Sequence, residues 1–360
     1  MDIYRNLQEH LDQFAVGFPA TESGEEIRIL KHLFDPEEAK LATKLTDKYD
    51  SLDSIYQRAK NLVSSIDELK EKLDHMVSKG STHCKKVNGE RQYANAYLVL
   101  GMYEYQVNRL TKSFLEDFNK YIIPTFGLEV AGYDLTQFRT IPVEKSITPE
   151  HNIPSYEELR EIVEDSEGPI TIQECVCRQA HEILEGPCEV TSRKETCMGF
   201  GDMAQMYIDE GWGRSLSKEE ALEILRKNEE DGLILQGQNN MRPGFICSCC
   251  GDCCGVLTSL KVFPNPAQFM KPRYHAEIDP ELCVGCETCI ERCQMDAIKM
   301  RKEKSKVNLK RCIGCGNCVV VCPSEAIKLI KNEKVMDTPE NEDEMFEKIL
   351  ESKIRIKGKK

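Results

Sequence analysis

Eight cysteines in the C-terminal part of the chain form two runs with the same spacing, C-x2-C-x2-C-x3-C, and the second run repeats the first at an offset of 29 positions. Runs of this form ligate cubane iron–sulfur clusters, and the fourth cysteine of each run serves the cluster of the other run. The spacing therefore predicts two [4Fe-4S] clusters with crossed ligands: Cys283, Cys286, Cys289 and Cys322 on the first cluster, and Cys312, Cys315, Cys318 and Cys293 on the second.

The residues around these cysteines favour clusters over zinc. Small residues such as Gly285 and Gly314 let the backbone curl so that three thiolates reach one cube. A zinc ribbon would need only four cysteines in two pairs. Residues 297–299 recur 29 positions later, as expected of a duplicated half-domain, although Gln294 stands where the second run has Pro323. The segment resembles the bacterial two-cluster ferredoxin.

A second group of cysteines lies upstream, with the spacing C-x-C-x10-C-x8-C. Four thiolates are enough for one metal centre, and soft thiolate ligands select zinc or iron–sulfur clusters. We expect a third [4Fe-4S] cluster here, with structural zinc as the alternative. The four residues are Cys175, Cys177, Cys188 and Cys197.

A third group places five cysteines within eight residues: Cys247, Cys249, Cys250, Cys253 and Cys254. This exceeds what one closed cubane requires, so a fourth cluster with a spare thiol is expected, and a metal-free structural or redox-active loop is the alternative. Adjacent cysteines also resemble the cysteine-rich modules of heterodisulfide-reductase-like enzymes, although the long spacings of those modules are absent.

Several other side chains near these groups could act on a cluster. His181 and His275 are candidate ligands, but each is expected to be an ordinary hydrogen-bonded histidine. Glu174, Arg178 and Arg193 could tune a cluster potential through hydrogen bonds and charge.

Composition limits the classes of protein that remain. The 360 residues include 18 cysteines, and the N-terminus has no apolar signal core, so we expect a reducing compartment, the cytoplasm, and no disulfide framework. No apolar run approaches the roughly 18 residues that span a bilayer. The net charge of −13 argues against nucleic acid as a standing partner.

The N-terminal part predicts helices followed by a hairpin. Ser23–Glu26 and Ser65–Glu68 have the pattern of capping boxes, Pro36 suits a first helical position, and a short helix fits 52–60. Asn88-Gly89 suits a two-residue hairpin turn. This is the winged helix-turn-helix order, yet residues 1–130 carry 17 Lys and Arg against 21 Asp and Glu, which disfavours DNA. We therefore expect partner docking or dimerisation, with DNA binding as the alternative.

The remaining segments complete an α+β organisation: a winged-helix-like domain over 1–123 whose last helix covers 101–123, a Pro-containing linker over 124–154, a cysteine-rich region over 155–260, a two-cluster ferredoxin domain over 274–332 and a charged tail over 333–360. Ser217–Glu220 predicts one further capped helix. Cys84, on the expected hairpin, is interpreted as a packed side chain rather than a redox-sensitive thiol.

Over nearly its full length the chain resembles a group of prokaryotic 4Fe-4S ferredoxin-type (4Fe-4S dicluster domain) proteins. The resemblance rests on Gly17–Gly24, on Glu174–Arg178, on Ile246–Gly251 and on the ferredoxin runs. It implies anaerobic or microaerobic electron transfer, and it supplies no catalytic residue.

Three functions are consistent with these features. The first is a relay of single electrons between a donor, such as a flavoprotein, and a partner oxidoreductase. The second is an iron–sulfur redox sensor that controls transcription through the winged helix. The third is a catalytic iron–sulfur subunit with chemistry at Cys247–Cys254. The chain has no P-loop and no dinucleotide-binding fingerprint, so hydride chemistry is expected to belong to a partner.

Overall fold

The computed structural model describes residues 2–147, 158–333 and 336–358. It divides into two compact units. The first, called here the N-terminal unit, comprises Met1–Asp134, Gln205–Trp212 and Phe346–Lys360. The second, called the cysteine-rich unit, comprises Leu135–Ala204 and Gly213–Met345. Every cysteine except Cys84 belongs to the cysteine-rich unit.

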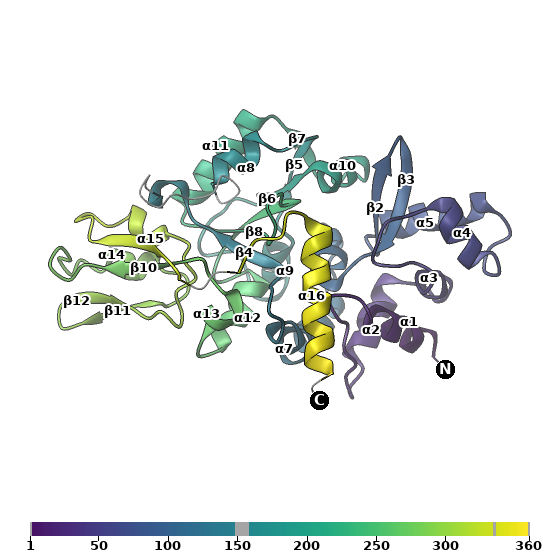
Figure 1. Ribbon diagram of the computed structural model, residues 1–360, viewed down its shortest axis with the longest axis horizontal. Coiled ribbons are helices and arrows are strands. Elements are labelled where there is room, and N and C mark those ends of the chain that lie inside the picture. Colours follow the sequence, from purple (N-terminus) through teal and green to yellow (C-terminus); the bar gives the residue numbers. More distant parts are fainter. Residues whose placement is uncertain (1, 148–157, 334–335, 359–360) are drawn as a thin grey trace. The chain divides into compact units, whose positions relative to one another are not determined.

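The N-terminal unit begins with helices and a small sheet (Figure 1). Strands β1, β3 and β2 pair antiparallel in that order. Asn88 and Gly89 both have positive φ between β2 and β3, which is the turn geometry expected there. The elements are α1 (Ile3–Leu11), α2 (Glu25–Leu33), α3 (Pro36–Ala42), β1 (Asp50–Ser51), α4 (Leu52–Ala59), α5 (Ile66–Ser78), β2 (Thr82–Val87) and β3 (Glu90–Asn95).

Helix caps follow the sequence signals except at α2. The Ser65 side chain accepts a hydrogen bond from the Glu68 amide, and Asp35 forms a full capping box ahead of Pro36. The expected box at Ser23 is absent, because Gly24 is the N-cap and makes no side-chain bond. The Thr21 hydroxyl instead accepts hydrogen bonds from the Gly24 and Glu25 amides.

The single helix expected over 101–123 is wrong. The chain forms short turns η1 (Leu98–Met102) and η2 (Glu104–Gln106), and only α6 (Lys112–Tyr121) is a regular helix. Positive φ at Asn108 interrupts the helical path, and Thr111 caps a new helix. The chain also continues past Pro124 through η3 (Ile122–Gly127) and α7 (Leu128–Ala131).

The cysteine-rich unit is built on a six-stranded antiparallel sheet of order β4-β8-β9-β6-β5-β7. An apolar core that includes Ile141, Ile172, Ile246 and Leu225 packs between this sheet and its helices. The elements are β4 (Phe138–Ile141), η4 (Glu144–Ser146), α8 (Leu159–Glu164), β5 (Ile170–Glu174), α9 (Val176–Leu184), β6 (Glu195–Phe200), α10 (Gly201–Asp209), β7 (Arg214–Leu216), α11 (Lys218–Glu230), β8 (Ile234–Gln238), β9 (Phe245–Cys249), α12 (Gly255–Val262) and α13 (Pro266–Met270). The expected Ser217 cap of α11 is present.

Two segments expected to lack structure form part of the fold. The linker expected over 124–154 contains β4, which pairs with β8 from Phe138↔Gln238 to Ile141↔Leu235. Pro149 and Pro154 lie outside the described residues. The expected charged tail contains α16 (Glu342–Lys357), whose Met345 and Ile349 are fully buried.

The ferredoxin segment has two short antiparallel ribbons (Figure 1). One pairs β10 (Tyr274–Ile278) with β13 (Ile327–Lys331), and the other pairs β11 (Ile298–Arg301) with β12 (Lys304–Val307). Helices α14 (Thr288–Arg292) and α15 (Asn317–Val320) each carry one cysteine of a run. This repeated half agrees with the 29-residue repeat.

Candidate iron–sulfur and metal centres

Four cysteines of the ferredoxin segment line one small hollow: Cys293, Cys312, Cys315 and Cys318. Backbone amides point at two of these sulfurs, from Ala276 to Cys312 Sγ and from Ala297 to Cys293 Sγ, each at 3.4 Å. Burial raises the pKa of the Cys315 thiol to about 12. A buried thiolate here therefore needs a compensating positive charge, which a bound metal supplies.

Three of the other four cysteines, Cys286, Cys289 and Cys322, lie near one another. Cys289 lies within electrostatic range of Cys286 and Cys322. The Thr288 hydroxyl donates to Cys286 Sγ at 3.4 Å, and Ser305 Oγ lies 3.4 Å from Cys289 Sγ. Cys286 is exposed at the surface, whereas Cys283 and Cys289 are buried. Cys293 of the first run thus lies with three cysteines of the second run, and Cys322 of the second run lies near Cys286 and Cys289 of the first.

The backbone around these groups fits a cubane. Gly285, Gly314 and Gly316 all adopt positive φ. A Cβ at Gly314 would collide with the Tyr274 carbonyl, and a Cβ at Gly316 would collide with the Ser146 side chain. The loops can therefore curl around a cluster only with glycine at these positions. Thiolate donors in this spacing suit iron–sulfur clusters.

The upstream cysteines form two further groups, and the first is a closed ring of six thiols. Each thiol is close enough to the next to shift its titration, in the order Cys175, Cys177, Cys254, Cys249, Cys247, Cys197 and back to Cys175. We call this set the thiol ring. The contacts with Cys177 and Cys197 lower the pKa of Cys175. The ring has two thiols more than a cubane needs.

The second upstream group contains Cys188, Cys250, Cys253 and Asp252. Cys188 Sγ lies 3.6 Å from Cys250 Sγ and 3.8 Å from Asp252 Oδ1. Burial raises the pKa of Cys250 to about 12. We call this set the Cys188 group. Cys188 therefore lies with Cys250 and Cys253. It does not lie with Cys175, Cys177 and Cys197, with which the sequence spacing had grouped it.

Strand geometry explains why the spatial groups differ from the expected ones. Strand β6 pairs with β9 so that Cys197 lies opposite Cys247. This pairing brings together cysteines from the two clusters that are separate in the sequence, 175–197 and 247–254. Side chains alternate between the two faces of a strand. Cys247 and Cys249 therefore share a face, while Cys250 turns to the other side.

Arg178 lies beside both upstream groups and is 5% exposed. Its Nη2 donates to Cys250 Sγ at 3.5 Å and to the Ser248 carbonyl at 3.2 Å. Burial opposes its charge, but the nearby Cys175 and Cys250 sulfurs raise the pKa of the guanidinium overall. A permanently charged group at this depth requires negative partners, and the neighbouring thiolates provide them.

The other proposed tuning residues make contacts elsewhere. Glu174 accepts from Gln179, and Arg193 donates to Asp231. His181 Nδ1 lies 2.7 Å from the Gly186 carbonyl, and His275 Nδ1 lies 2.6 Å from Asn332 Oδ1. These two rings hydrogen-bond to protein oxygens, in keeping with ordinary histidines.

One apolar core joins the thiol ring to the ferredoxin segment. Ile234, Met295 and Ile313 belong to this core, and cysteines of both sites pack in it: Cys247, Cys249 and Cys254 of the ring, and Cys293 and Cys315 of the ferredoxin segment. The Gly251 amide also donates a hydrogen bond to Oε1 of Gln294 at 2.5 Å, and Gln294 is the residue that follows Cys293 in the sequence. The sequence did not indicate this junction, because its residues come from three separate segments.

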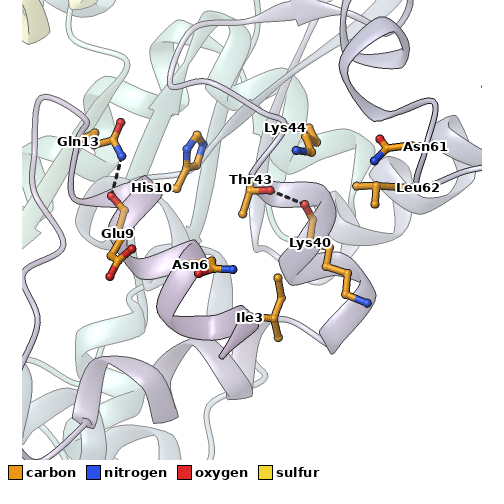
Figure 2. A pocket seen from close by; sticks show the side chains of 10 residues that line it. All are labelled: Ile3, Asn6, Glu9, His10, Gln13, Lys40, Thr43, Lys44, Asn61 and Leu62. Atoms are coloured by element: carbon orange, nitrogen blue, oxygen red, sulfur yellow. Dashed lines mark hydrogen bonds between the residues drawn. The ribbon is translucent and has the colours of Figure 1, made fainter. Parts of the chain in front are cut away.

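The N-terminal unit offers a different kind of hollow (Figure 2). Polar side chains including Asn6, Glu9 and Gln13 line it, and His10 Nε2 lies 2.7 Å from the Leu45 carbonyl. No cysteine lines this hollow. Cys84 is buried, and burial raises its pKa, so it has the character of a packed side chain.

Residues 276–329 match the family model described as a 4Fe-4S dicluster domain. The comparison with curated proteins gave no match. Within the described residues, no helix has the length and apolar character needed to cross a bilayer. The match and the cysteine geometry identify an iron–sulfur protein with a ferredoxin-type C-terminal domain. Domains of this kind serve electron transfer in general.

Proposed function

We propose that this chain is an iron–sulfur electron-transfer protein that passes single electrons to or from a partner oxidoreductase. When bound, [4Fe-4S] clusters supply reversible one-electron chemistry. The ferredoxin cysteines would hold two clusters in the crossed arrangement, and the thiol ring would hold a third. The chain is thus an electron carrier or an electron-transfer subunit rather than an enzyme with its own substrate.

The observation that carries this proposal is the apolar core between the ring and the ferredoxin segment. Met295 and Ile313 are each 2% exposed and belong to the core in which cysteines of both sites pack. These side chains exclude water from the space between the sites. The hydrogen bond from Gly251 to Gln294 fixes the two loops against each other. A rigid, dry junction is what a multi-site relay requires.

The exposed end of the relay lies at Cys286. This thiol is at the surface, and its neighbours Leu282 and Val284 are 50% and 67% exposed. Exposed apolar side chains beside a cofactor suit a transient contact with a redox partner. Acidic side chains, including Glu281 and Glu287, flank them and would orient a basic partner.

For the N-terminal unit we propose a winged-helix-like role in docking or dimerisation. The proposal is supported by the order of its elements, in which helices precede a β2–β3 hairpin whose strand β3 pairs with β1. Two of the three cations on the hairpin form ion pairs within the unit, and the third, Lys85, lies over the Tyr49 ring. Lys86 pairs with Asp209 at 2.7 Å, and Arg91 pairs with Asp74 and with Glu210. Cations held in ion pairs are poor ligands for DNA phosphates, so transcriptional control is the weaker alternative.

Catalysis at the thiol ring is a second candidate, because the ring has two thiols more than a cubane needs. Replacing Cys254 by Ser would then change the spectroscopic signature of the reduced protein. If every signal matches ordinary low-potential [4Fe-4S] clusters before and after the replacement, the catalytic alternative fails.

The test of the relay is an iron and labile-sulfide count on anaerobically purified full-length protein, with identification of co-purifying redox proteins. We expect about twelve irons per chain, because each cubane holds four. Because the ring has two thiols to spare, the triple variant Cys175→Ser/Cys177→Ser/Cys197→Ser, which leaves three ring thiols, should remove about four of them, whereas Cys84→Ser should remove none. A count of about eight irons that the triple variant leaves unchanged would confine clusters to the ferredoxin domain and contradict the three-site relay.

A further inference from the structure

The Cys188 group has the dimensions of a mononuclear metal site. Its four ligand atoms, three sulfurs and one carboxylate oxygen, all lie within 4.8 Å of one another. Two of these separations are 3.6 Å, between Cys188 Sγ and Cys250 Sγ, and 3.8 Å, between Cys188 Sγ and Asp252 Oδ1. These separations are compatible with ligand atoms that share one metal ion.

These separations distinguish zinc from a cubane. A tetrahedral zinc ion with Zn–S bonds of about 2.3 Å places its ligand atoms about 3.8 Å apart. A cubane holds its cysteine sulfurs roughly 6 Å apart, because each binds a different iron corner. The group is therefore too tight for a [4Fe-4S] cluster.

We propose that Cys188, Cys250, Cys253 and Asp252 bind one zinc ion. Three thiolates make the site soft enough to select zinc, and the carboxylate completes a tetrahedral set. Because four protein ligands leave no open position, the site is structural rather than catalytic. It is separate from the thiol ring and does not depend on the proposed electron relay.

The surroundings of the group hold the ligands in place. Asp252 Oδ2 accepts a hydrogen bond from the Glu189 amide at 2.8 Å, which leaves Oδ1 directed at Cys188. Arg178 donates to Cys250 Sγ at 3.5 Å. Four anionic ligands around a divalent ion leave a net charge of −2, and the buried guanidinium offsets half of it. Such outer contacts orient ligands and strengthen metal binding.

Zinc bound at this position would link the loop of residues 185–194 to the turn after β9. Cys188 lies in the segment between α9 and β6, which has no regular secondary structure from 185 to 194. Cys250 and Cys253 lie in the turn between β9 and α12, and two cysteines of the thiol ring flank them: Cys249 at the end of β9 and Cys254 at the start of α12. The ion would therefore fix the turn that positions two ring ligands.

The test is the metal content of full-length protein purified anaerobically from zinc-supplemented medium. We expect one zinc per chain. Cys188→Ala should lower the zinc content at least tenfold and leave the iron content unchanged, whereas the triple ring variant Cys175→Ser/Cys177→Ser/Cys197→Ser should lower iron and leave zinc unchanged. Loss of iron on Cys188→Ala, or wild-type protein without stoichiometric zinc, would overturn the proposal.

X-ray absorption at the zinc edge of the wild-type protein would identify the zinc ligands directly. This measurement does not depend on whether the variants fold. The expected shell is three sulfurs at about 2.3 Å and one oxygen at about 2.0 Å. A shell of nitrogen and oxygen only would mark adventitious zinc and overturn the assignment. A four-sulfur shell would exclude Asp252 and overturn the proposed ligand set.

Discussion

Neighbouring cysteines in this chain serve different sites. Cys249 belongs to the thiol ring and Cys250 to the Cys188 group, and Cys254 and Cys253 divide in the same way. In an extended segment, adjacent side chains point to opposite faces, so a pair of adjacent cysteines can supply two centres from one turn. Spacing along the chain identified the candidate metal ligands, but it could not divide the upstream cysteines between the two spatial groups.

The ferredoxin glycines can be tested at single positions. Gly314 has φ of 70°, and a Cβ there would meet the Tyr274 carbonyl. We expect Gly314→Ala to cost at least about 2 kcal/mol in stability and to reduce the iron bound by the ferredoxin segment, because the strain falls beside Cys312 and Cys315. Iron content and thermal unfolding would measure this.

Gly255→Ala is the matched control. Gly255 directly follows Cys254, and nothing lies within 4 Å of its added Cβ. Alanine also has a higher helix propensity than glycine, which suits the first turn of α12. Equal losses of iron in the two variants would show that the backbone conformation at Gly314 is not what the cluster loop requires.

At the level of elements, patterns with local causes were predictable and long-range pairings were not. Asp35, Ser65 and Ser217 cap helices because the cap depends on residues only three positions away. The helix expected over 101–123 was wrong, because apolar spacing cannot reveal the left-handed residue at Asn108. Strand β4 was missed because it is stabilised by β8, about a hundred residues away.

The C-terminal helix α16 is the clearest case of structure within a charged segment. Its apolar side chains recur among acidic and basic ones, and Lys353 reaches the Asp12 and Phe14 carbonyls at 2.5 and 2.6 Å in the N-terminal unit. Because Ile349 is fully buried, we expect Ile349→Ala to destabilise this unit by about 3 kcal/mol.

The control for this change lies on the same helix. Ile354 is 63% exposed, so Ile354→Ala should change stability by less than about 0.5 kcal/mol. Trp212, the single tryptophan, packs on Tyr105 and Tyr207 within the N-terminal unit, and its fluorescence in urea would report unfolding of this unit. Equal midpoints for the two variants would mean that α16 does not contribute to this core.

Across the whole molecule, the candidate metal ligands all lie in the cysteine-rich unit, and the N-terminal unit contains only Cys84. The ferredoxin core contains Cys289, Cys312 and Cys318 among its buried residues. The buried residues of the N-terminal unit, such as Leu7, Ile29 and Leu69, form a core without cluster cysteines. The clustering of cysteines in the sequence predicted this division, although not the boundaries of the two units.

Removing metal should therefore unfold the two units unequally. A metal site that exists only in the folded state adds its free energy of metal binding to the free energy of folding. We expect anaerobic chelation with an oxidant to strip protection from hydrogen exchange across β10–β13, α14 and α15, while α2, α5 and α6 keep theirs. Alkylation followed by mass spectrometry should label the cysteines of 175–322 and leave the buried Cys84 unlabelled. Equal loss of protection in α5 and α14 would contradict this division, because it would mean that the N-terminal unit also depends on bound metal.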